Sequence, residues 1–335
     1  MGLVAFFADA TAKESAGWPG EIGSARHAAI PEGALPGDGR FVRMWQTISP
    51  DGAYVLGWGR PGARSSKFGE IPWDAGDSLS TDPSDEAMEN YLVDAVHGTV
   101  LGKLPDLHYF AGKQRHHLIC AWSPDSRAAV AVFQARWGNA FESRGIAYID
   151  AAQRKSYPIV KQMNAIMARQ WPDEVRRGGG DIPFFEPVML DAHTFIVDAY
   201  GWEVEAPAYF VRRLVFRVAI QDGAARVALV KTSAIPEDED LDPTEMGMSD
   251  EGKEEALLNA YRNLRAKLGR EERRILQQSQ ARWLRYRAAH EGEDTFTYRR
   301  IRELVLRAKW RSSSFSADAL PGPGTQRAAS PARFG

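Results

Sequence analysis

The chain has 335 residues, 44% of them hydrophobic and 26% charged, and its formal net charge is −2 at neutral pH. This composition is typical of an ordinary globular protein with room for two domains. The single cysteine, Cys120, excludes an intramolecular disulfide, and no apolar run reaches the roughly eighteen residues that a transmembrane helix needs.

Residues 1–40 form an N-terminal lead. Its apolar residues 2–8 run into Ala8-Asp9-Ala10, which looks like the end of a signal peptide with a small-residue cleavage site. The apolar run is short and has no basic start, so two interpretations stay open. The lead is either the remnant of a longer signal peptide, with the true start codon upstream, or a short strand without a targeting role. The first implies a periplasmic or secreted protein, and the second leaves a cytoplasmic one.

Residues 41–234 contain a repeated pattern of strand, tight turn and strand. Ser, Pro, Asp and Gly favour such turns, and they stand between two apolar runs in each copy. The turns of the three copies are Ser49-Pro50-Asp51-Gly52, Ser123-Pro124-Asp125-Ser126 and the weaker Asp191-Ala192-His193. A second strand pair follows each copy, around Tyr91 to Leu101, Tyr148 to Ile159 and Leu214 to Leu229.

These units predict an antiparallel β-repeat and look like β-propeller blades. Three blades are too few to close a propeller. Either a fourth is hidden in residues 1–46, or the sheets form an open, curved or sandwich-like array. The first unit is the longest, and its extra residues are assigned to a loop over residues 62–90. An amphipathic helix is predicted over residues 161–177, inserted into the β-repeat, with Met163, Ile166, Met167 and Gln170 on one face.

The charge is unevenly distributed along the rest of the chain. Residues 235–252 carry eight acidic side chains and no basic one, whereas residues 253–311 carry sixteen basic side chains against eight acidic ones. Residues 235–250 are therefore predicted to be an exposed acidic linker, which could lie along the basic segment in a salt-sensitive contact. Residues 312–335, rich in Ser, Ala, Gly and Pro, are predicted to be a disordered tail.

The basic segment, residues 251–311, has the apolar spacing of α-helices. The first helix is predicted over residues 251–268, with Ser249 as its N-cap and Gly269 as its terminator. A second helix begins near residue 270, and the short turn between them predicts antiparallel packing. Residues 296–310 could complete a three-helix unit. The residues that line up along one face are Leu257, Tyr261, Leu264 and Leu268 in the first helix, then Leu276, Gln280, Trp283 and Arg287 in the second.

This helical segment resembles the lysozyme inhibitor LprI-like domain, a small helical domain of bacterial envelope proteins. The resemblance rests on Leu257-Leu258-Asn259-Ala260-Tyr261, on the leucine spacing, and on the run from Gln280 through Trp283 to Arg287. The cysteines that bracket the family's helices have no counterpart here. The resemblance implies a helical fold and a protein partner, for which the family points to a lysozyme-type hydrolase.

The sequence contains none of the common catalytic motifs: no Walker loop, GxSxG elbow, HExxH pair or CxxC pair. Adjacent His116 and His117 would face opposite sides of a strand, which disfavours one shared metal. No enzyme activity, cofactor or metal site is therefore predicted. Six aspartates are assigned to turns, where their side chains bind backbone groups: Asp51, Asp94, Asp125, Asp150, Asp191 and Asp198.

We expect a non-enzymatic, envelope-associated protein-binding protein with an α+β fold, an antiparallel β-repeat followed by a helical unit. The family-motif positions Tyr261, Gln280, Trp283 and Arg287 are expected to be mainly structural, with direct binding as the alternative. Two other functions stay open. The basic helices could bind nucleic acid or an anionic surface, although their arginines form no continuous stripe, or the chain could be a propeller-like scaffold.

Overall fold

The structure, a computed structural model, describes residues 40–59, 65–69, 89–107, 116–137, 140–180, 182–201, 210–235, 250–289 and 294–312. Three β-sheets precede three long C-terminal helices, so the α+β class predicted from the sequence is confirmed. The N-terminal lead up to residue 39, almost all of the acidic linker, and the tail from residue 313 lie outside the described residues.

The first sheet has five strands in the order β3-β1-β2-β4-β5. Its elements are β1 (Arg40–Met44), the 3-10 turn η1 (Trp45–Thr47), β2 (Tyr54–Gly59), β3 (Ser65–Gly69), β4 (Glu89–Asp94) and β5 (Val100–Leu104). β3 pairs parallel with β1, while the other neighbours pair antiparallel. The segment predicted to be a loop over residues 62–90 thus contains an edge strand, whose five residues are too few to show a period in the sequence.

The second and third sheets each have four antiparallel strands in chain order. The second contains β6 (His116–Trp122), β7 (Ala128–Trp137), β8 (Ala140–Asp150) and β9 (Lys155–Pro158). The third contains β10 (Phe184–Met189), β11 (Thr194–Gly201), β12 (Phe210–Gln221) and β13 (Ala224–Ser233). The three copies of the sequence repeat are therefore three sheets, and each repeated turn joins the first strand of a sheet to its next core strand.

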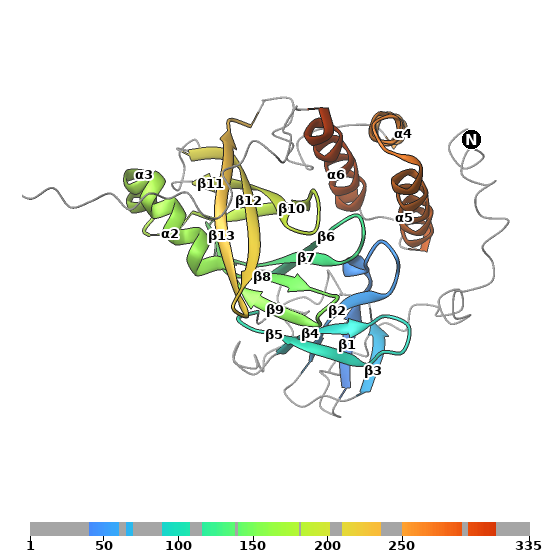
Figure 1. The fold of residues 1–335 in the computed structure, drawn as a ribbon, viewed down its shortest axis with the longest axis horizontal. Helices are drawn as coiled ribbons and strands as arrows, with labels where there is room; N and C mark the ends of the chain where they lie inside the picture. The colour runs from blue at the N-terminus through green and yellow to red at the C-terminus, as the bar shows by residue number, and fades with distance from the viewer. Residues whose placement is uncertain are drawn as a thin grey trace, which may run out of the picture.

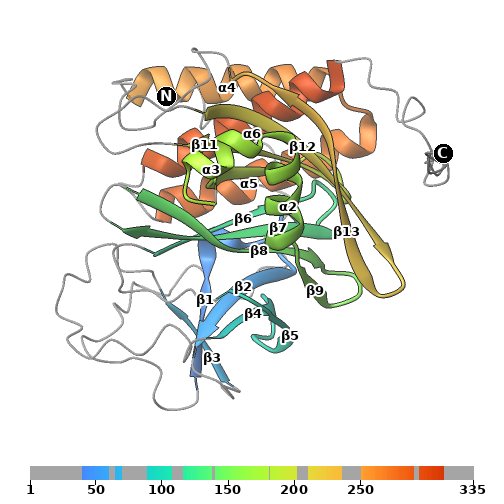
Figure 2. The same ribbon diagram turned by 90° about the vertical axis from the view of Figure 1, so that its left-hand side faces the viewer.

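The sheets stack face to face in chain order (Figures 1 and 2). One hydrophobic core lies between the first two sheets and includes Leu56, Leu92 and Phe133. The next core lies between the second and third sheets and includes Tyr148, Phe195 and Phe216. Successive side chains of a strand point to opposite faces of the sheet. In β7, Ala129 and Phe133 enter the first core while Val130 and Val132 enter the second, which explains the continuous apolar run at the start of this strand.

The inserted helix is two helices, α2 (Val160–Gln170) and α3 (Pro172–Arg177), rather than the single one predicted over residues 161–177. Pro172 begins α3 because proline has no backbone N–H and fits only the first turn of a helix. Met163, Ile166 and Met167 of α2 are buried in the core between the second and third sheets, as their spacing predicts. Gln170, predicted on the same face, is exposed.

The C-terminal helices are α4 (Asp250–Ala266), α5 (Arg270–Ala289) and α6 (Asp294–Ser312). Glu254 near the start of α4 pairs with Arg287 near the end of α5, which confirms the predicted antiparallel arrangement. The helix nearest to α4 is nevertheless α6, and the two run parallel. Lys253 near the start of α4 lies over the Tyr298 ring near the start of α6, and Lys267 just after α4 donates to the Ala308 carbonyl near the end of α6. Gly269, predicted as the terminator of the first helix, also caps the start of α5, because its N–H donates to Glu272 Oε2 at 3.0 Å.

α6 belongs to two hydrophobic cores at once. Its residues Ile301, Leu304 and Ala308 pack against α4 and α5. Leu306, on another side of the helix, packs with Val188, Ile196 and Val215 on the outer face of the third sheet. The helices are therefore continuous with the stack of sheets instead of forming an independent unit, and they lie beside β10 and β6 (Figure 1).

Candidate functional site

The repeated turns are built by the same hydrogen bonds. Ser49 Oγ donates to Asp51 Oδ1 at 2.6 Å and accepts from the Tyr54 N–H at 2.9 Å. Ser123 makes the equivalent bonds, to Asp125 Oδ1 at 2.7 Å and from the Ala128 N–H at 3.0 Å. The third turn has no such serine, and there Asp191 itself accepts from the N–H groups of His193 and Thr194. The turn roles predicted for these three aspartates are confirmed.

Hydrogen bonds also join the first turn to the second, and Arg307 links the second sheet to the third. The indole N–H of Trp122, at the end of β6, donates to the carbonyl of Thr47 at 2.7 Å, and the Asp51 N–H donates to Ser126 Oγ at 3.0 Å. Arg307 of α6 then bridges two sheets, because Nη2 donates to the Trp122 carbonyl at 2.7 Å and Nε to the Met189 carbonyl at 2.9 Å. The helices are thereby fixed above a row of turns.

β10 contains a bulge that turns a carboxylate toward α6. Pro187 cannot donate to the neighbouring strand, and the pairing with β11 shifts register between Phe185 and Val188. Glu186 takes a φ of 44°, a left-handed conformation that is unusual for a residue with a side chain. The bulge exposes both the carboxylate and the carbonyl of Glu186 to arginines of α6.

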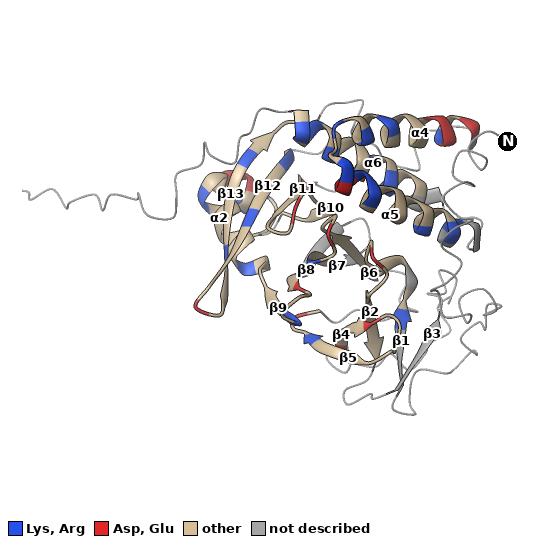
Figure 3. Ribbon diagram, turned by 45° about the vertical axis from the view of Figure 1, so that its right-hand side comes forward, with Lys and Arg blue, Asp and Glu red and all other residues tan. Residues whose placement is uncertain are grey.

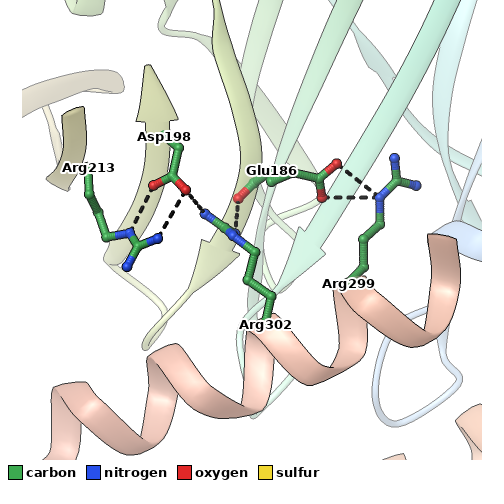
Figure 4. A network of polar contacts seen from close by, with 5 residues as sticks. All are labelled: Glu186, Asp198, Arg213, Arg299 and Arg302. Carbon is green, nitrogen blue, oxygen red and sulfur yellow. Dashed lines mark hydrogen bonds and ion pairs between the residues drawn. The ribbon is translucent and has the colours of Figure 1, made fainter. Parts of the chain in front are cut away.

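Figure 4 shows the resulting network between α6 and the third sheet. Arg299 Nε donates to both carboxylate oxygens of Glu186 at 3.1 Å. Arg302 donates to the Glu186 carbonyl and to Asp198 Oδ2, the latter at 2.6 Å. Arg213 of β12 also binds Asp198, at 2.9 and 3.2 Å. The turn role predicted for Asp198 is wrong: it lies inside β11, 3% exposed, between two arginines.

A second polar cluster joins α5 to α6. Arg300 donates to Gln280 Oε1 at 2.9 Å, to Ser279 Oγ at 3.2 Å and to Glu303 at 2.7 Å, and Glu303 also pairs with Arg307. Burial alone would raise the pKa of Glu303, but the two guanidiniums outweigh burial and hold that pKa below its ordinary value. Burial lowers the pKa of Arg307, whose ordinary value is high enough for it to remain a cation at neutral pH.

Between these groups lies a cleft of about 170 Å³, bounded by β6 and β10 on one side and by α5 and α6 on the other. Figure 3 shows Lys and Arg along both helices. The cleft is lined by five arginines and only two glutamates, so it is positively charged. Its apolar wall includes Ile48, Leu118 and Val188. The charged lining residues are Arg282, Arg299, Arg300, Arg302, Arg307, Glu186 and Glu303.

A second cleft, of about 180 Å³, lies on the other side of Arg307 and is lined mostly by apolar side chains such as Leu264 and Trp310. Its carboxylates already serve local structure. Asp125 and Asp191 accept hydrogen bonds from their own turns, and Glu272 pairs with Arg311. The first cleft is therefore the stronger candidate for recognition of a charged group.

The structure places the four family-motif residues in different surroundings. Tyr261 is buried in the helical core, which raises the pKa of its hydroxyl. Gln280 is 1% exposed and holds Arg300. Arg287 pairs with Glu254 and lies 5.1 Å from the centre of the Trp283 ring. Trp283 alone among the four lines the cleft.

Sequence reasoning missed Glu186 and Arg299. The one signal for them is the Glu-Pro pair inside an otherwise strand-like run, because proline in a strand interior indicates a bulge. Cys120 also lines the cleft, and burial raises the pKa of its thiol, which stays protonated at neutral pH. Among the described residues, no three His, Cys, Asp or Glu side chains gather as metal ligands, and no helix is long and apolar enough to span a bilayer.

No protein-family model and no curated protein matches the chain. One solved structure with a partial similarity is Kuenenia stuttgartiensis hydrazine synthase, at 12% sequence identity and a TM-score of 0.23. The match covers 56% of this chain and 53% of that chain, about half the length of the hydrazine synthase chain. At this TM-score the similarity supports no conclusion about fold or activity.

Proposed function

We propose that this chain is a non-enzymatic protein-binding protein whose partner inserts one side chain into the cleft between β6, β10 and the helices α5 and α6. The size of the cleft carries the proposal. Drug-sized ligands occupy pockets of roughly 300–1,000 Å³. A volume of about 170 Å³ is closer to that of cavities that hold a single benzene-sized group.

The lining of the cleft supports the same function. Protein interfaces derive most of their affinity from a few anchor side chains in small, well-packed pockets, and aromatic residues and arginine are enriched there. Trp283 and Arg299 are partly exposed at the cleft, while its other walls are fixed by the stack of sheets. A rigid site loses little entropy when a partner binds.

The resemblance of residues 251–311 to the LprI-like domain supports a lysozyme-type hydrolase as the partner, and with it a periplasmic or secreted location. Lysozymes are commonly basic, as is this cleft, so overall charge attraction does not explain such a complex. An exposed arginine that reaches a catalytic carboxylate of the hydrolase supplies local complementarity instead. Arg299 is the arginine best placed for this role, because its side chain is 28% exposed.

A turbidity assay tests this function. A bacterial cell suspension is cleared by lysozyme in the presence of excess purified protein, and complex formation is followed in parallel by size-exclusion chromatography. The wild type and the control Arg274→Gln are expected to slow clearing, whereas Trp283→Ala and Arg299→Gln are expected to lose the effect. Clearing at an unchanged rate, with no complex on the column, would reject a lysozyme-type partner.

The alternative of nucleic-acid or anionic-surface binding has less support. Several arginines of the helices already pair with acids of the same helical unit, for example Arg274 with Glu271 and Arg311 with Glu272. Arg302 and Arg307 face the sheets and are largely buried. The surplus of basic residues in this segment is therefore used largely within the protein.

A further inference from the structure

We infer that the anchor side chain is a carboxylate, from an aspartate or glutamate of the partner, and that Arg299 binds it. This inference rests on the proposed function and adds the chemistry of the group recognised. It depends on three features of the cleft: the unused donors of Arg299, the pairing of the other arginines of α6 within the protein, and the apolar wall.

Arg299 uses only one of its three nitrogens within the protein. Its Nε donates to both oxygens of Glu186, and across the part of the chain that the structure describes neither Nη1 nor Nη2 has a hydrogen-bonding partner. Figure 4 shows these two nitrogens pointing away from Glu186. A guanidinium edge with two parallel donors matches the two oxygens of a carboxylate.

The other arginines of α6 at the cleft already bind groups of the protein. Arg300 binds Gln280, Ser279 and Glu303, and Arg302 binds Asp198 and the Glu186 carbonyl. Arg307 donates to two backbone carbonyls and pairs with Glu303. These three side chains hold the helix in place. The arginine of α6 that offers both Nη groups to an incoming carboxylate is therefore Arg299.

The remaining lining favours a carboxylate over a more highly charged anion. Ile48, Leu118 and Val188 offer an apolar surface to the methylene groups of a side chain. Glu186 keeps one negative charge 3.1 Å from Arg299 Nε. A phosphate ion has no methylene groups to place on the apolar wall, and Glu186 already offsets part of the charge of Arg299, so a carboxylate side chain is favoured over a phosphate.

The inference is tested by selecting random heptapeptides, displayed on phage, against the immobilised full chain. Each peptide is fused at its C-terminus, so carboxylates come only from side chains. The inference predicts enrichment of Asp or Glu at one position beside apolar residues. The best peptide is then synthesised with blocked ends, together with its Asn or Gln counterpart, and titrated by isothermal calorimetry.

We expect Arg299→Gln to lower the affinity for the acidic peptide about tenfold. The variant should then bind the acidic peptide no more tightly than the amide counterpart. The matched control Arg274→Gln, an exposed arginine of α5 paired with Glu271, should bind as the wild type does. Glu186→Gln should bind the acidic peptide more tightly, because it removes the competing carboxylate. If the Glu186–Arg299 pair had a merely structural role, Glu186→Gln and Arg299→Gln would both bind the peptide more weakly, and to a similar extent.

The possible failures are distinguishable. Enrichment of purely apolar peptides that compete for the cleft would overturn the carboxylate inference and leave the protein-binding function intact. A selection with no enrichment over a blank surface would contradict both. Circular dichroism of Arg299→Gln and of the double variant Glu186→Gln with Arg299→Gln checks folding. Weaker binding by a folded double variant supports a direct role of Arg299, and wild-type binding by it would overturn that role.

Discussion

Arg302 of α6 and Asp198 of β11 form an ion pair with 2.6 Å between nitrogen and oxygen, although 104 residues separate them in sequence. The same carboxylate binds Arg213 on the neighbouring strand. One buried aspartate thus binds two arginines and joins the C-terminal helix to the third sheet. This contact defines one side of the cleft, because it fixes α6 relative to β10.

Replacement of Asp198 by asparagine is expected to lower the free energy of unfolding by about 3–5 kcal/mol, since it leaves two buried guanidiniums without their carboxylate. Urea unfolding followed by circular dichroism measures the effect. The matched control is Asp173→Asn, which breaks the exposed pair with Arg176 and should change stability little. An equal decrease of the free energy of unfolding in the two variants would contradict the role assigned to Asp198.

The hydrogen bond between Trp122 and Thr47 joins the first two sheets. Trp122→Phe should destabilise the protein more than Trp58→Phe, by about 1–3 kcal/mol, because it leaves the Thr47 carbonyl without this donor. Trp58 is a close control: it is 2% exposed, and its indole nitrogen has no partner among the described residues. Both substitutions remove the same atoms, so the difference in urea unfolding isolates the hydrogen bond.

Gly52 tests the contact of α5 with the first repeated turn. Gly52 and Gly223 have nearly equal positive φ angles, 77° and 75°, so alanine at either position costs about 1 kcal/mol of backbone strain. A Cβ at Gly52 would also lie 3.0 Å from Arg282 Nε, whereas a Cβ at Gly223 has nothing within 4 Å.

Gly52→Ala is therefore expected to be the more destabilising of the two in chemical denaturation. The excess should disappear when both glycine variants are compared in an Arg282→Ala background, because the crowded side chain is then absent. An excess that persists in that background would show that α5 does not pack on the turn in this way.

The pH dependence of stability reports on Glu303. Its pKa is lowered in the folded state, so the stability from its pairing with Arg300 and Arg307 is present above the unfolded-state pKa of about 4.3. That stability is lost as the pH falls from there through the folded-state pKa. Glu303→Gln should therefore be less stable than the wild type at neutral pH, and this difference in stability should disappear in acid. A difference in unfolding temperature between variant and wild type that does not change with pH would argue against this pairing.

The sequence predicted the elements that have local signatures. Serine, proline and aspartate marked the turns at Ser49 and Ser123, and apolar spacing marked the core face of α2 and the stripes of α4 and α5. These features depend on neighbours within a few residues. Pro172 also indicates a break between two helices, because proline is favoured in the first turn of a helix and disfavoured in its interior. The two helices were nevertheless predicted as one.

The candidate site was not predictable in the same way. Its residues come from β6, β10, α5 and α6, and no local pattern indicates that Arg299 meets Glu186 across 113 residues. Asp198 was assigned to a turn because aspartate is common there, whereas two distant arginines stabilise it inside a strand. The packing of α6 on the third sheet was missed because Leu306 and Trp310 lie outside the stripe that faces α4 and α5.

Hydrogen exchange of the full chain, with and without the best selected peptide, tests the cleft as the binding site most directly. We predict slower exchange in β6, in β10 around Glu186, and in the part of α6 that contains Arg299, with no such change in Arg299→Gln. Protection confined to α2 and α3, or to the far strand β5 of the first sheet, would contradict this account.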